Sequence, residues 1–325
     1  MHDWQHAIAR GILAGLLFWA TCGVSALHSV LVWQFRHRLD LVELKTALAF
    51  LTLLPPGGAL LVALFPYALP SGIHHATCYL GWLEATFGDG VFVWMRPLAL
   101  LAGGMLLVWL VGLVRRAFAV FHSIRQLVAL SHPPSPKLQS VLEKVVPRRW
   151  HARFREVALP SRADGVYGGI CLLSQETVQN LSERQLQAVV AHEWQHLRAR
   201  DGWFALVVGL LVSGVGLGTW SRAYRYWSDS AELLADARAT RLGVVRTDLA
   251  RTLLQRQAEA QGVLLGFSAD SALLEERLRY LLSPASASGS ARWLWAPILV
   301  CAGVLLYAVW QTGSASICAI HCVLF

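Results

Sequence analysis

The pattern His-Glu-x-x-His at residues 192–196 constrains the fold of this chain more than any other feature. On an α-helix, positions i and i+4 share a face, so His192 and His196 can direct two imidazole nitrogens at one zinc ion. Glu193 follows the first histidine, where its carboxylate can take a proton from a metal-bound water molecule. The pattern predicts a helix that supplies two zinc ligands and a general base.

Local signals support that helix. Ser182 and Gln185 form a capping box of the S-x-x-Q type, immediately before the apolar positions Leu186, Val189 and Val190. The helix is expected to begin there, which places both histidines well inside it and holds them rigidly. The alternative is a helix whose histidines and glutamate face solvent, and a second motif downstream argues against it.

That second motif is Glu232 with Asp236. A hydrolytic zinc keeps three protein ligands and one open position, and His-His-Glu is one of the standard sets. Glu232 is the best third ligand in the chain. Asp236, one turn further on the same face, is expected to accept the free ring N–H of a ligand histidine. The alternative is an exposed acidic helix face. One zinc ion is the expected cofactor.

Composition predicts a membrane protein. Hydrophobic residues make up 55% of the 325 residues and charged residues only 15%, whereas soluble domains carry about 25% charged residues. Four apolar stretches are long enough to span a bilayer, at residues 11–33, 46–69, 91–114 and 293–310. The predicted fold is therefore mainly α and integral to the membrane, with about four transmembrane helices and a cytoplasmic α+β zincin-like protease domain between the third and fourth.

Three parts of the chain follow from this reading. Residues 1–114 are a membrane domain with three transmembrane helices, residues 115–290 the cytoplasmic metallopeptidase domain, and residues 291–325 the last span and a short outer tail. The positions of lysine and arginine predict a multi-pass protein of the inner (cytoplasmic) membrane, with its active site facing the cytoplasm. We attribute the net charge of +8 to this uneven distribution of lysine and arginine and to attraction to anionic lipid headgroups, and not to direct nucleic-acid binding.

Residues 203–220 are also apolar, and they lie between His196 and Glu232. A single crossing would separate the ligands by about 30 Å of hydrocarbon. If Glu232 is a ligand, this segment must dip into the membrane and return, or lie buried against other helices. Asp201 and Ser228, at its two ends, are then expected on the same side.

Periodicity and turn signals outline the rest of the middle region. Residues 165–174 read as a strand whose glycines would let a substrate backbone approach, although a plain core strand with a bulge fits equally well. Further helices are expected at residues 115–130, 137–146, 230–242, 248–261 and 271–282, and another strand at residues 153–159.

Two clusters lie outside this region, at His74, His75 and Cys78 and at Cys318, His321 and Cys322. They favour one structural disulfide or incidental polar residues, with a metal or redox sensor as the alternative.

Residues 182–201, with the strand before them, resemble membrane-embedded gluzincin metallopeptidases. The nearer match is the antirepressor family typified by beta-lactam sensor-transducers of the BlaR/MecR type. Ala235, between Glu232 and Asp236, resembles the HtpX-type heat-shock and prenyl-protein endopeptidases instead. The resemblance implies that His192, His196 and Glu232 bind zinc and that Glu193 is the general base.

These observations predict a zinc endopeptidase that cleaves protein substrates at the cytoplasmic membrane face, in regulatory proteolysis of a transcriptional repressor. A membrane-protein quality-control endopeptidase and a non-catalytic membrane signalling scaffold are the alternatives. The expected partners are a protein or peptide substrate, the lipid bilayer and a cytosolic repressor protein. The sequence alone does not identify the substrate, the activating signal, the oxyanion-stabilising residue or the oligomeric state.

Overall fold

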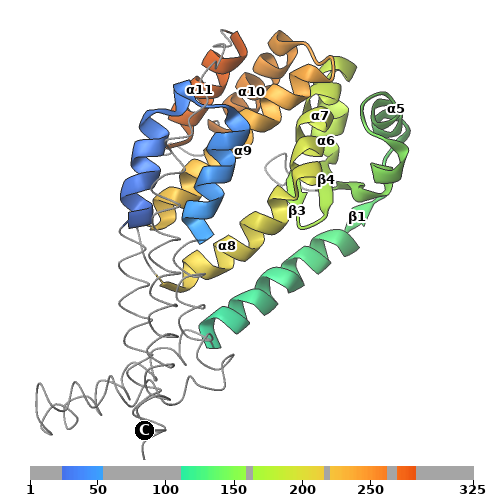
Figure 1. The fold of residues 1–325 in the computed structure, drawn as a ribbon. Coiled ribbons are helices and arrows are strands. Elements are labelled where there is room, and N and C mark those ends of the chain that lie inside the picture. The colour runs from blue at the N-terminus through green and yellow to red at the C-terminus, as the bar shows by residue number, and fades with distance from the viewer. Residues whose placement is uncertain (1–23, 54–110, 159–163, 216–219, 262–268, 283–325) are drawn as a thin grey trace, which may run out of the picture.

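The computed structural model describes residues 24–53, 111–158, 164–215, 220–261 and 269–282. These residues are mostly helical and surround a small sheet (Figure 1). Helices run over residues 24–34, 41–53 and 111–129. The labelled helices are α5 (Pro136–Val145), α6 (Gln175–Asn180), α7 (Glu183–Ala199), α8 (Asp201–Val215), α9 (Trp220–Arg241), α10 (Arg246–Gln261) and α11 (Ala269–Leu282), with short 3-10 turns η1 (Arg36–Arg38) and η2 (Arg148–Arg153).

The sheet has the strand order β1-β2-β4-β3. Its strands are β1 (Ser131–His132), β2 (Phe154–Val157), β3 (Gly165–Tyr167) and β4 (Ile170–Ser174). β2 and β4 pair in parallel, while β1 and β3 pair antiparallel at the two edges. The single strand predicted over residues 165–174 is thus a β3–β4 hairpin that turns at Gly168 and Gly169. Of its two strands, β3 forms an edge of the sheet and β4 lies inside it.

α7 lies at the centre of the structure. It contacts α5, α9 and α10, and it also touches β3 and β4. Ser182 caps its N-terminus in a capping box with Gln185, as the sequence predicted. The apolar residues of α7 are buried in a core shared with α5, β2 and β4, whose members include Leu138, Val141, Leu142, Phe154, Leu173, Leu186, Val189 and Val190.

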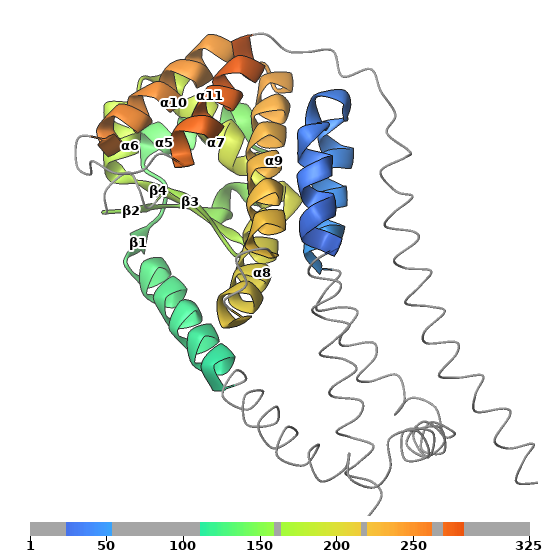
Figure 2. The same ribbon diagram turned by 90° about the vertical axis from the view of Figure 1, so that its left-hand side faces the viewer.

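The two helices α8 and α9, which include most of the apolar segment at residues 203–220, both pack near α7. α8 runs away from the end of α7, and α9 runs back and packs against both α8 and α7. Figures 1 and 2 show the helices of residues 24–53 lying beside α9. Asp201 and Ser228 line the same pocket, in agreement with the expectation that the two ends of this segment lie on one side.

The structure corrects the membrane prediction. Among the helices described, none is both long and apolar enough to cross a bilayer. α8 has 15 residues, which gives about 22 Å of helix against about 30 Å of hydrocarbon. α9 has 22 residues but carries several charges, namely Arg222, Arg225, Asp229, Glu232, Asp236, Arg238 and Arg241. The predicted integral membrane fold, with transmembrane helices and an inner-membrane location, is therefore contradicted by the part of the chain that the structure describes.

Several predictions fall on residues that the structure does not describe. Of the four apolar stretches, only residues 24–33, 46–53 and 111–114 belong to the described part, and residues 293–310 lie wholly outside it. Both Cys/His clusters, around Cys78 and around Cys322, also lie outside it. The predicted helices of the middle region are confirmed with shifted ends; α9, for example, begins ten residues before the predicted start at Ser230.

Candidate metal centre

Two histidines of α7 face each other at the centre of the site. His192 and His196 are one turn apart, and both are buried, with exposed fractions of 7% and 8%. Their Nε2 atoms lie 3.2 Å apart, and the rings meet edge to face. The predicted helical geometry is therefore present, and the alternative of solvent-facing histidines is wrong.

α9 brings Glu232 to the same point. Its Oε2 lies 3.2 Å from His192 Nε2, and its Oε1 lies 3.4 Å from His196 Nε2. Ligand atoms of these three residues all lie within 4.8 Å of one another. Donors held 2.0–2.2 Å from a tetrahedral ion are about 3.3–3.6 Å apart. The two nitrogens and the carboxylate are thus placed to hold one metal ion.

A carboxylate lies behind each imidazole ring. His192 Nδ1 lies 2.8 Å from Asp236 Oδ1, and His196 Nδ1 lies 2.9 Å from Asp201 Oδ2. A carboxylate at Nδ1 keeps the proton there and leaves the Nε2 lone pair for a metal. Asp236 therefore lies where the sequence analysis expected it, next to a ligand histidine.

Arg277 of α11 joins the two carboxylates of α9. Its Nη1 lies 3.0 Å from Glu232 Oε2, while its Nε and Nη2 donate to the two oxygens of Asp236 at 2.7 and 2.8 Å. A planar guanidinium suits this forked contact in a way that an ammonium does not. Arg277 fixes both Glu232 and the residue that orients His192.

The pKa values in the metal-free site reflect this packing of charges. Burial alone would lower the pKa of His196, but the charge of Glu232 and the hydrogen bond to Asp201 outweigh it and raise that pKa to about 10. Burial would raise the pKa of Glu232, but the positive charges of Arg277 and His196 hold it well below its usual range. The ligand cluster thus holds protons that a bound cation would displace.

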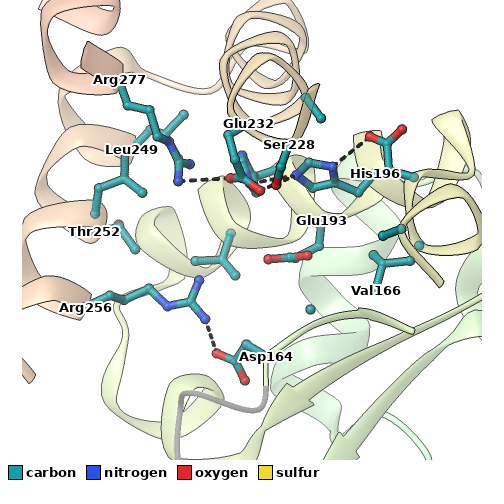
Figure 3. Close-up of a pocket in the computed structure, with 18 of the residues that line it drawn as sticks. Asp164, Val166, Glu193, His196, Ser228, Glu232, Leu249, Thr252, Arg256 and Arg277 are labelled. Atoms are coloured by element: carbon teal, nitrogen blue, oxygen red, sulfur yellow. Dashed lines mark hydrogen bonds and ion pairs between the residues drawn. The ribbon is translucent and has the colours of Figure 1, made fainter. Parts of the chain in front are cut away.

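Glu193 points into a pocket beside these ligands (Figure 3). The pocket has a volume of about 250 Å³ and is lined by residues of α7, α8, α9, α10, α11 and the β3 edge. Gly165 and Val166 of β3 lie on its wall, so an edge strand borders the candidate metal centre. Glu193, His192, His196 and Glu232, all predicted from sequence, meet in this one pocket.

An ion pair lies on the opposite side of the pocket. Arg256 of α10 pairs with Asp164, as Figure 3 shows. The buried Asp164 side chain also accepts hydrogen bonds from the Ser174 backbone N–H and from the Thr177 hydroxyl. Burial raises the pKa of Asp164, and the charge of Arg256 opposes that rise. The pair links the start of β3 to α6 and α10.

The sequence analysis did not assign Asp201 or Arg277 to the site. Asp201 stands five residues after His196 and directly after Arg200, the left-handed residue that ends α7. This short distance from a predicted ligand is the sequence signal that could have identified Asp201 as part of the site. Arg277 is 45 residues beyond Glu232 in the sequence. Only the general need of buried carboxylates for a cation pointed to it, and that need does not select one arginine among many.

Comparison of the chain with known proteins found no matching family model, no matching curated protein and no matching solved structure. The resemblance to antirepressor peptidases therefore remains a prediction, and the functional argument depends on the site itself.

Proposed function

We propose that this chain is a zinc-dependent endopeptidase, with His192, His196 and Glu232 as zinc ligands and Glu193 as general base. The observation that supports it most strongly is the convergence of the three ligand side chains within 4.8 Å, in the pocket that Glu193 also lines. Two imidazole nitrogens and one carboxylate are a donor set typical of hydrolytic zinc.

Zinc bound there would polarise the scissile carbonyl and lower the pKa of a water molecule. Glu193 takes a proton from this water while the water oxygen bonds to the carbonyl carbon. When the carbon–nitrogen bond breaks, the Glu193 carboxyl gives that proton to the leaving amine nitrogen. Asp236 and Asp201 keep the Nδ1 protons of His192 and His196 in place throughout.

The substrate is proposed to bind as an extended segment along the β3 edge. Gly165 and Val166 line the pocket at that edge. The start of α8 packs against the carbonyls of Val166 and Gly168, so the substrate is proposed to pair with β3 at its Gly165 end, by strand addition. This places a peptide bond near Glu193. The proposal places the extended substrate on β3, and not on the whole of residues 165–174.

We further propose that the activity is regulatory, with a transcriptional repressor as substrate. This proposal is based on the resemblance of residues 182–201 to antirepressor peptidases. Proteolysis of a cell lysate by the purified protein, with labelling of new N-termini, tests this. A few defined cuts are expected, whereas many unrelated cuts would favour quality control.

The Glu193→Gln variant tests the peptidase itself. It keeps the ligands, so it should bind one zinc ion per chain, but loss of the general base should lower kcat by about 100- to 10,000-fold. Metal analysis and cleavage of an unfolded protein substrate measure the two effects. Glu183→Gln is the matched control, because Glu183 lies exposed at the start of the same helix and pairs with Lys144. Equal cleavage by the Glu193→Gln variant and the wild type would show that the activity belongs elsewhere.

A further inference from the structure

The N-terminal helical pair (residues 24–53) packs against the helices that carry the metal centre. It lies beside α9 in both Figures 1 and 2. Its apolar residues form a buried cluster with Trp227 of α9, and Phe204 and Ala205 of α8 pack against that cluster. The cluster includes Val32, Leu39, Leu44, Ala47, Leu48 and Leu51.

Lys45 extends from this pair to the back of the metal centre. Its ammonium group binds Asp201 Oδ1, while the other oxygen, Oδ2, lies 2.9 Å from His196 Nδ1. Both side chains of the Lys45–Asp201 pair are largely buried, at 14% and 10% exposure. Asp201 therefore divides its two oxygens between a candidate ligand histidine and a lysine 156 residues away in sequence.

The buried surroundings of Lys45 make the charges of Lys45 and Asp201 depend on each other. Its ammonium lies 5.7 Å from the centre of the Trp227 ring, and burial lowers the pKa of Lys45 although Asp201 opposes that change. A buried carboxylate that loses its cation is strongly destabilised, so Asp201 would have to move or find water. Such movement would turn the His196 ring, because the ring is held through Nδ1.

A second ion pair attaches the same N-terminal helical pair to α11. Arg36 binds Glu276, the residue immediately before Arg277, which in turn contacts Glu232 and Asp236. The Arg36 guanidinium also lies over the Trp33 ring, 4.7 Å from its centre. The two attachments thus lead to the two sides of the ligand cluster, one to His196 and one to Glu232.

We propose that Lys45 is a positioning residue of the metal centre, which acts through Asp201 on His196, and that the N-terminal helical pair thereby sets the metal affinity of a site to which it contributes no ligand. Any partner or modification that shifts helix 41–53 by about 1 Å would break the Lys45–Asp201 hydrogen bond and weaken metal binding. This inference uses the metal-binding part of the proposed function and does not depend on peptidase activity.

Zinc affinity of the full chain, measured by competition with a chromophoric chelator at fixed pH, tests the proposal. Lys45→Met should weaken zinc binding about tenfold, in the range found for residues that orient metal ligands. Lys45→Arg, which keeps the charge, should stay within about threefold of wild type. Lys137→Met is the matched control, since Lys137 binds the backbone carbonyls of Gln179 and Leu181, and it should leave the affinity unchanged.

A double-mutant cycle separates this role from a general loss of packing. In an Asp201→Asn background, Lys45→Met should change zinc affinity by less than about twofold, because the two residues act on His196 as one unit. The visible spectrum of the cobalt-substituted Lys45→Met variant should differ from that of the wild type, and the spectrum of Lys45→Arg should match the wild type. If Lys45→Met does not fold, Lys45→Gln takes its place in the cycle.

An unchanged affinity in Lys45→Met, or an equal tenfold loss in both backgrounds, would overturn the proposal. A wild-type chain that binds no zinc would overturn it together with the proposed function. A chain that shows the Lys45 effect on affinity but cleaves no protein would leave this inference standing and would remove only the peptidase proposal.

Discussion

Each histidine nitrogen that faces the candidate metal position depends on a carboxylate behind its ring, and each carboxylate depends on a cation. Asp236 serves His192 and is held by Arg277, while Asp201 serves His196 and is held by Lys45. Buried charges of this kind are tolerated only when they are paired. Removing either cation should therefore affect both stability and metal binding.

Arg277→Met is expected to destabilise the metal-free protein by about 3 kcal/mol, because it removes the guanidinium from the buried Asp236 and from the partly exposed Glu232. Chemical unfolding in the presence of a chelator measures this loss. Added zinc should recover part of the stability, since the metal would compensate the charge of Glu232. Arg279→Met on the same helix is the control: Arg279 pairs with Glu275 at the surface, and its loss should cost under about 1 kcal/mol. Similar losses in the two variants would contradict this account of Arg277.

At the scale of elements, the contact between α8 and β3 shapes the pocket wall. A Cβ atom at Gly202 would lie 2.6 Å from the Val166 carbonyl oxygen and 3.0 Å from that of Gly168. Both are backbone atoms, so no side chain can move aside to relieve the clash. The first turn of α8 can therefore approach the β3 edge only with glycine at this position, which follows Asp201 directly.

Gly202→Ala is expected to destabilise the protein by about 1 to 3 kcal/mol, the usual cost of overpacking, and to weaken zinc binding by shifting Asp201. Gly209→Ala in the same helix is the matched control, because nothing lies within 4 Å of the Cβ position there. Alanine favours a helix, so that variant should be stabilised by up to about 1 kcal/mol. Thermal unfolding and chelator competition distinguish the two. An innocuous Gly202→Ala would mean that β3 and α8 are further apart.

The elements that sequence analysis predicted well are those specified by local signals. The Ser182 capping box and the spacing of His192 and His196 predicted the position of α7 and the face that carries both histidines, because cap and face are properties of a few neighbouring residues. The β3–β4 hairpin was missed because the glycines of residues 165–174 were interpreted either as room for a substrate backbone or as a bulge, although two adjacent glycines such as Gly168 and Gly169 also form a tight hairpin turn. Contacts such as Lys45 with Asp201 depend on tertiary packing and leave no local signal.

At the scale of the whole molecule, apolar composition did not predict what covers the helices that the structure describes. Large apolar side chains of α8 and α9, such as Phe204 and Trp227, pack against the N-terminal helical pair. A long apolar run predicts burial, but it does not determine whether protein or lipid covers the segment. Of the charged residues interspersed in α9, Glu232 and Asp236 belong to the metal centre, and Asp229 lies near Arg36 of the N-terminal helical pair and Glu276 of α11.

Asp229, at this junction between the N-terminal helical pair, α9 and α11, gives the protein a pH-dependent stability. Burial and the nearby charges of Glu276 and Glu232 raise its pKa to about 6, although Arg225 and Arg36 oppose the rise. Because this pKa is raised above the unfolded value of 3.8, the protonated carboxyl favours the native state. Its contribution is fully present below about pH 4 and is lost as the pH rises through about 6.

Asp229→Asn mimics the protonated carboxyl, so it should stabilise the protein at pH 7.5 and give no gain near pH 4. The full pKa shift corresponds to about 3 kcal/mol, and partial solvent screening reduces the expected gain to about 1 to 2 kcal/mol. Urea unfolding of metal-free wild type and variant at several pH values measures the difference. A gain that stayed constant from pH 4 to pH 7.5 would show that Asp229 does not titrate in this range, and that the junction between the N-terminal helical pair, α9 and α11 tolerates its charge.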